Sequence, residues 1–163
     1  MNFSKVPFYI RLLLPILWYG LIFYLTELPE ASSDNTSHVV KEATAPVFEA
    51  ITDTKIALGE TNPIADAINA VSRIAAHLFV FGIQGILLYF LANKSFQFNK
   101  KLFWLIVFAV AILGISDEIH QSYVPGRNAA GIDVLKDIAG AIVFMLLAFK
   151  IVKHKTNQGF TSL

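Results

Sequence analysis

The stretch that decides the fold is LFWLIVFAVAILGISDEIHQ, residues 102–121. Its larger part is apolar and carries no charge, whereas it ends in the strongly polar run SDEIHQ at 116–121. An apolar helix of about 20 residues crosses the roughly 30 Å hydrocarbon core of a membrane. We therefore expect a membrane-spanning helix over about 102–119, with a group of polar side chains at one end.

Three other stretches share this apolar character, at about 7–26, 74–92 and 132–151. The whole chain of 163 residues is 55% apolar and 15% charged, with a mean hydropathy of +0.59. Soluble domains average roughly 45–50% apolar and about 25% charged residues. The sequence thus predicts one all-α domain over residues 1–163, an integral bundle of four membrane helices in the cell membrane.

Charge and cysteine usage exclude several classes of protein. The net charge is +1, so no broad basic surface is available for nucleic acid, and none is expected as a partner. The chain has no cysteine, which removes disulfides, thiol nucleophiles and cysteine-ligated metal centres.

The orientation of the bundle follows from its lysines, because basic residues favour the cytoplasmic side. Lysines precede the first stretch, separate the second from the third and follow the fourth, whereas acids dominate the segment 27–73. Both termini are therefore expected in the cytoplasm. The long segment 27–73 is expected to be an extracytoplasmic loop.

Two helices are expected in relation to this loop. Apolar residues recur at helical spacing between Val40 and Leu58, which predicts an amphipathic helix on the membrane surface. Asn62 followed by Pro63 is typical of a helix start, and the helix is expected to continue into the second span.

Polar residues inside or at the ends of membrane helices are costly and are candidates for function. Here they gather at the expected outer ends of the second, third and fourth spans, and we expect one outward-opening polar pocket there. Arg73 and His77 lie on one helix face, as do Asp133 and Asp137. The candidate residues are Arg73, His77, Asp117, Glu118, His120, Gln121, Arg127, Asp133, Lys136 and Asp137.

A purely structural interpretation stays open beside this one. Buried charges need partners, so pairs such as Arg73 with Glu118, or Arg127 with Asp133, would fasten helix ends together. Small residues at 82, 85 and 139–141 would allow helices to approach closely, within one chain or in a homo-oligomer.

The run Ser116-Asp117-Glu118-Ile119-His120-Gln121, then Val124-Pro125-Gly126-Arg127, then Asp133 with Asp137 and Gly140, resembles the signature of the VanZ-like membrane proteins. The match extends to Arg73, Ala76 and His77. Many members carry Glu-Tyr where this chain has Val80 and Phe81. The resemblance implies a bacterial four-helix membrane protein. The namesake is associated with low-level resistance to teicoplanin-type drugs, which bind lipid-linked cell-wall precursors.

Two functional classes remain open for the polar pocket. In the first, the protein binds or remodels an anionic lipid or a lipid-linked envelope precursor. Arg73, Arg127 and Lys136 would contact phosphate. The carboxylates would hold these cations in place or bind sugar hydroxyls.

In the second class, the protein is a hydrolase or transferase acting on the same kind of lipid. Glu118 or His120 would act as general base, and Arg127 would stabilise transition-state charge. A metal variant would use Asp117, Glu118, His120 and Asp133 or Asp137. The spacing D-E-x-H is not a fixed metal motif, so the sequence assigns no metal ligand and no cofactor.

Overall fold

The computed structural model describes residues 6–27, 63–125 and 129–160. In these ranges the chain forms four helices and no strand. They are α1 (Phe8–Glu27), α3 (Pro63–Ala92), α4 (Lys100–Gln121) and α5 (Gly131–Phe160). The predicted all-α class is confirmed, and α3 begins at Pro63 as expected. The surface helix predicted near 40–58 lies outside the described residues.

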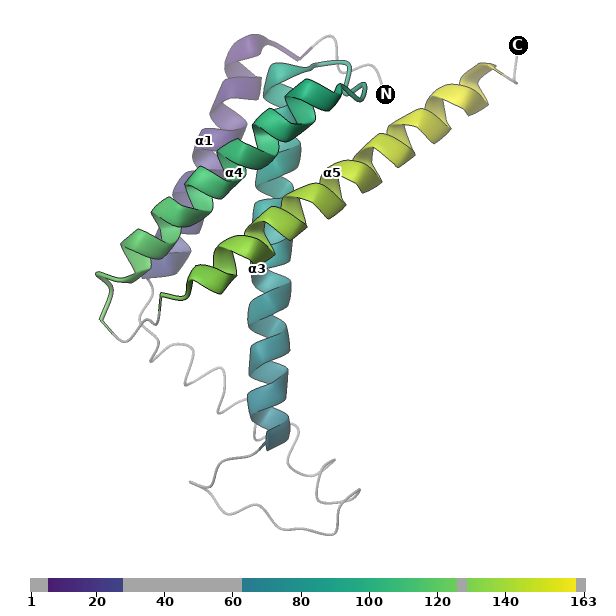
Figure 1. Cartoon of the computed structure of the whole chain (residues 1–163). Coiled ribbons are helices and arrows are strands. Elements are labelled where there is room, and N and C mark those ends of the chain that lie inside the picture. Colours follow the sequence, from purple (N-terminus) through teal and green to yellow (C-terminus); the bar gives the residue numbers. More distant parts are fainter. Residues whose placement is uncertain (1–5, 28–62, 126–128, 161–163) are drawn as a thin grey trace.

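Successive described helices run in alternating directions (Figure 1). The central helix is α3, which contacts α1, α4 and α5. Helix α1 begins and α5 ends on the upper side of the view. The last turns of α1 and α4 and the first turn of α5 lie together at the other end, which we call the site end.

Three helical segments are long and apolar enough to cross a membrane: α1, Arg73–Ala92 of α3, and α4. Many of their large apolar side chains face outward, as a lipid environment requires; Leu17, Leu105 and Phe108 are at least 60% exposed. Helix α5 is not among these segments because charged residues stand at both ends of its apolar run, so its span remains a prediction.

Small residues let α3 and α5 pack tightly. This is the close approach of helices within one chain that the sequence predicted for these positions. A Cβ added to Gly140 would overlap the backbone carbonyl of Leu78, and one added to Gly85 would lie 3.0 Å from Cβ of Ala141. Such close backbone contact is typical of membrane helix pairs. It fixes the position of α5 along the axis of α3, and hence which of their polar residues come into contact.

The end opposite the site is fastened by aromatic packing around the turn between α3 and α4. Tyr89, Phe96 and Phe149 contact one another with ring centroids 4.8–5.1 Å apart. The Tyr89 hydroxyl donates to the carbonyl of Gln97 at 2.6 Å and accepts from the N–H of Asn99 at 2.9 Å. This cluster sets the register of α4 against α3.

Polar side chains of α1 hold it to its neighbours in a setting where unpaired groups are costly. Nε1 of Trp18 donates to the carbonyl of Val80 at 2.9 Å, and the Tyr19 hydroxyl donates to that of Leu113 at 3.0 Å. These two bonds place the last turn of α1 beside α3 and α4 at the site end.

Candidate functional site

A histidine of α3 and two aspartates of α5 form the centre of the site. Nδ1 of His77 lies 2.9 Å from Oδ1 of Asp137, and Nε2 lies 3.6 Å from Oδ2 of Asp133. Both aspartates are almost completely buried. They project from the same face of α5 because they are one helical turn apart. Packing of α5 on α3 therefore brings both carboxylates to the imidazole.

Asp133 also forms ion pairs with two cationic side chains. Nη2 of Arg73 lies 2.9 Å from its Oδ2, and Nζ of Lys136 donates to its Oδ1. The structural interpretation of the sequence had paired Arg73 with Glu118, and Asp133 with Arg127. Arg127 lies outside the described residues. In the structure, Asp133 forms ion pairs with Arg73 and Lys136.

Glu118 enters the site from α4. Its Oε2 accepts the backbone N–H of Ala130 at 2.6 Å, just ahead of the first turn of α5. Its Oε1 is buried, and it has no hydrogen-bond partner among the described residues. One carboxylate oxygen of Glu118, one of Asp133 and one nitrogen of His77 lie within 4.8 Å of one another. Three helices thus contribute to one compact group.

Gly114 provides the space in which Asp137 lies against α4. A Cβ at position 114 would be 2.7 Å from Oδ2 of Asp137. This Oδ2 is buried and has no hydrogen-bond partner in the described part of the chain, whereas Oδ1 faces His77. The apolar stretch that decides the fold therefore carries one residue whose small size serves the site.

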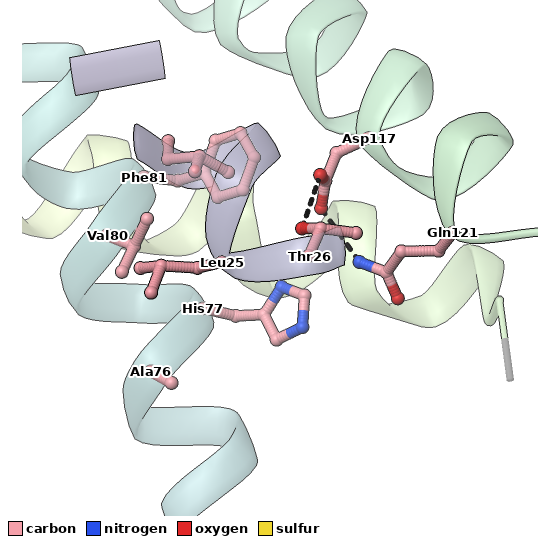
Figure 2. Close-up of a pocket in the computed structure, with 9 residues that line it drawn as sticks. Leu25, Thr26, Ala76, His77, Val80, Phe81, Asp117 and Gln121 are labelled. Atoms are coloured by element: carbon pink, nitrogen blue, oxygen red, sulfur yellow. Dashed lines mark hydrogen bonds between the residues drawn. The ribbon is translucent and has the colours of Figure 1, made fainter. Parts of the chain in front are cut away.

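A pocket of about 180 Å³ adjoins this group between α1, α3 and α4. Figure 2 shows Asp117 at its polar end, with its two oxygens accepting from Thr26 at 3.0 Å and from Gln121 at 2.8 Å. The His77 ring projects into the same space from α3. Its lining residues are Ile22, Leu25, Thr26, Ala76, His77, Val80, Phe81, Asp117 and Gln121.

His120 lies apart from the His77 group. Its Nε2 is 3.1 Å from Oε1 of Glu27, and its ring stacks on Phe23 with centroids 4.2 Å apart. Residues 118 and 120 project about 200° apart around a helix, because each residue turns it by about 100°. The metal variant proposed from sequence joined Glu118 with His120, whereas the geometry joins Glu118 with His77.

The contribution of α1 was not foreseen from the sequence. Thr26 and Glu27 end the first apolar stretch, and the alternating helix directions bring them to the site end. Their polarity at that boundary was the available signal. Among the predicted site residues, Arg73, Glu118, Asp133, Lys136 and Asp137 lie in the group around His77, and Asp117 and Gln121 line the pocket.

The described site carries more negative than positive charge. Its carboxylates are Asp117, Glu118, Asp133 and Asp137, all at most 8% exposed, and its permanent cations are Arg73 and Lys136. The hydrogen-bond donors to Asp117 in the pocket, Thr26 and Gln121, are both neutral. The group is thus suited to receive a cation, a proton or hydrogen-bond donors such as hydroxyls.

Comparison with known proteins bears on identity only through a family model. Neither the curated proteins nor the solved structures contain a significant match to the chain. The family model described as VanZ/LLP1 matches residues 11–153, most of the chain. This range contains every described residue of the pocket and of the His77 group, and it confirms the resemblance seen in the sequence. The chain belongs to the VanZ/LLP1 family of membrane proteins.

Proposed function

We propose that this protein binds the head of a lipid-linked envelope precursor, or of a related anionic lipid, in the pocket between α1, α3 and α4. The observation that carries the proposal is the two-sided character of this pocket. Ile22, Val80 and Phe81 supply an apolar wall, and Asp117 with Gln121 supplies a hydrogen-bonding end. An amphiphile needs both surfaces at once.

The polar end suits a sugar or amide group, because a carboxylate beside a carboxamide offers both acceptors and donors. Arg73 suits the phosphate. It lies one turn before His77 on α3, its side chain is 43% exposed, and guanidinium binds phosphate through two hydrogen bonds. Lys136 and Arg127 are proposed as further phosphate contacts.

In this proposal α5 is the fourth span and both termini are cytoplasmic. The lysine distribution supports this orientation. The site end then lies in the outer leaflet, where teicoplanin-type drugs meet their lipid-linked target. Reduced teicoplanin susceptibility is the expected phenotype of a bacterium that expresses the protein.

Binding is testable with farnesyl diphosphate and farnesol, which share a chain and differ in the head. Purified protein in detergent is expected to bind the diphosphate at least about tenfold more tightly, as for one lost charged contact of about 1.5–3 kcal/mol. Arg73→Gln should remove most of this preference. Lys94→Gln, on the exposed turn after α3, is the matched control. Equal binding of the two probes by the wild type would overturn the proposal.

A second candidate function is hydrolysis or transfer at the phosphate of such a lipid. The observation that favours it is the placement of His77 between two buried aspartates, since a carboxylate that orients a histidine makes it an effective base. Release of inorganic phosphate from farnesyl diphosphate, with farnesyl monophosphate as the other product, measures this activity. Turnover that His77→Gln abolishes and His120→Gln preserves supports an enzyme, and binding without turnover supports a binding protein.

A further inference from the structure

We propose that His77, Glu118 and Asp133 form a binding site for one divalent metal ion of the zinc or manganese type. Asp137 orients His77 in this site without contacting the ion. The inference rests on the described side chains and holds whether or not the protein binds a lipid.

The first argument is distance. One potential ligand atom from each of the three residues lies within 4.8 Å of the other two. Ligands at about 2.0–2.2 Å from a zinc ion lie on the order of 3–4 Å apart, so small movements of side chains bring these atoms around one ion. The three residues come from α3, α4 and α5, which are already packed together.

The second argument is an unpartnered buried oxygen. Oε1 of Glu118 is shielded from solvent and has no hydrogen bond among the described residues, although Oε2 is bound to Ala130. A buried carboxylate oxygen without a donor is unfavourable. A carboxylate oxygen of Glu118 lies near His77 and Asp133, so a cation held between the three residues would bring positive charge to this under-bonded carboxylate.

The third argument is the histidine. If Nδ1 of His77 donates its proton to Oδ1 of Asp137, Nε2 carries a lone pair. That nitrogen faces Oδ2 of Asp133 at 3.6 Å, and two lone pairs repel each other unless a proton or a metal ion lies between them. In metal sites, the ring nitrogen of a ligating histidine that does not bind the metal usually donates its proton to a carboxylate, a backbone carbonyl or a water.

The cations at Asp133 leave room for an ion. Each carboxylate oxygen has two lone pairs, so Oδ2 of Asp133 accepts from Arg73 and retains a second site. Glu118, Asp133 and Asp137 outnumber Arg73 and Lys136 in the described group, and Asp117 adds a further negative charge nearby. A divalent ion compensates this excess.

The donor set indicates the class of metal. One imidazole and two carboxylates suit zinc or manganese, whereas magnesium and calcium prefer oxygen ligands alone. Three protein ligands leave at least one coordination position open, as in catalytic zinc sites. His77 lines the pocket, so that position would be close to a bound molecule.

Metal binding is tested on the purified, full-length protein after removal of any affinity tag and treatment with chelator. Equilibrium dialysis against zinc chloride, followed by elemental analysis, should give about one tightly bound ion per chain. His77→Gln and Glu118→Gln should each weaken binding at least tenfold. His120→Gln, which removes a histidine at the same end of the bundle, should bind as the wild type does.

A second measurement needs no variant and no lipid. Zinc should raise the unfolding temperature of the wild type in detergent, and magnesium at the same concentration should not, because a ligand that binds only the folded state stabilises it. No bound zinc, or equal binding by wild type and His77→Gln, overturns the inference, and so does an unchanged unfolding temperature. If the wild type binds zinc but shows no preference for farnesyl diphosphate over farnesol, that result counts against the proposed function alone.

Discussion

Asp137 lies in the space that Gly114 leaves on α4, because a Cβ at 114 would be 2.7 Å from Oδ2 of Asp137. Gly114→Ala should therefore push α5 outward or turn Asp137 away from His77. We expect a loss of about 1–3 kcal/mol in the free energy of unfolding, the usual cost of an added group in a packed interior. Reversible unfolding in mixed micelles measures it.

Gly20 on α1 is the matched control for this change. An added Cβ there meets nothing within 4 Å, so Gly20→Ala should be neutral or slightly stabilising. Equal effects of the two substitutions would show that Asp137 does not depend on the space at position 114.

Gly140→Ala should be more harmful than Gly82→Ala. The neighbour of Gly140 is the backbone of Leu78, which cannot turn away, whereas the neighbour of Gly82 is the ring of Phe144. We expect at least about 1–3 kcal/mol of destabilisation at position 140 and a smaller loss at position 82. Thermal unfolding of the two variants beside the wild type checks the order, and a reversed order would contradict the close contact of α3 and α5.

Thr26 and Asp117 should be energetically coupled, because the Thr26 hydroxyl donates to Oδ1 of Asp117 in a buried contact between α1 and α4. A double-mutant cycle with Thr26→Val and Asp117→Ala should give a coupling of about 0.6 kcal/mol and at most about 1.7 kcal/mol, as double-mutant cycles give for hydrogen bonds between membrane helices. Thr26→Val combined with Tyr123→Phe provides the control cycle, since Tyr123 is 81% exposed. Additive effects of Thr26→Val and Asp117→Ala would argue against α1 as a wall of the pocket.

Tyr89→Phe should loosen the turn between α3 and α4 while preserving the ring packing. The hydroxyl bonds to the backbone at both Gln97 and Asn99. Its loss removes the acceptor of the Asn99 N–H, whereas the Gln97 carbonyl keeps a bond from Nδ2 of Asn93. We expect a destabilisation of about 1–3 kcal/mol and faster amide hydrogen exchange in residues 93–99. Tyr9→Phe on the exposed face of α1 is the control, and unchanged exchange in the turn would refute the role of the hydroxyl.

Much of this arrangement was predictable because each apolar stretch is a continuous helix with a clear polar boundary. The four helices and the start at Pro63 followed from the sequence pattern, and spacing put Arg73 with His77 and Asp133 with Asp137, each pair on one helix face. These residues share helix faces, and periodicity reports faces well.

Periodicity does not report which helices pack against each other, or at which relative position along their axes. The pairing of His120 with Glu27 and the entry of Thr26 both depend on how α1 packs against α4. That packing is set by contacts far apart in the sequence, such as Trp18 with Val80. The choice of Asp133 as partner of Arg73 depends in the same way on the contact between Gly140 and Leu78.

The packing of α5 on α3 has a consequence for biosynthesis. A chain grows from its N-terminus, so α3 is complete before α5 leaves the ribosome. Helix α5 carries Asp133 and Asp137 near its start, and charged residues of this kind hinder entry into the bilayer. In α3, the segment Arg73–Ala92 is long and apolar enough to cross a membrane, and it carries His77, the later partner of Asp137. The order of the helices along the chain thus lets the earlier helix receive the later, more polar one.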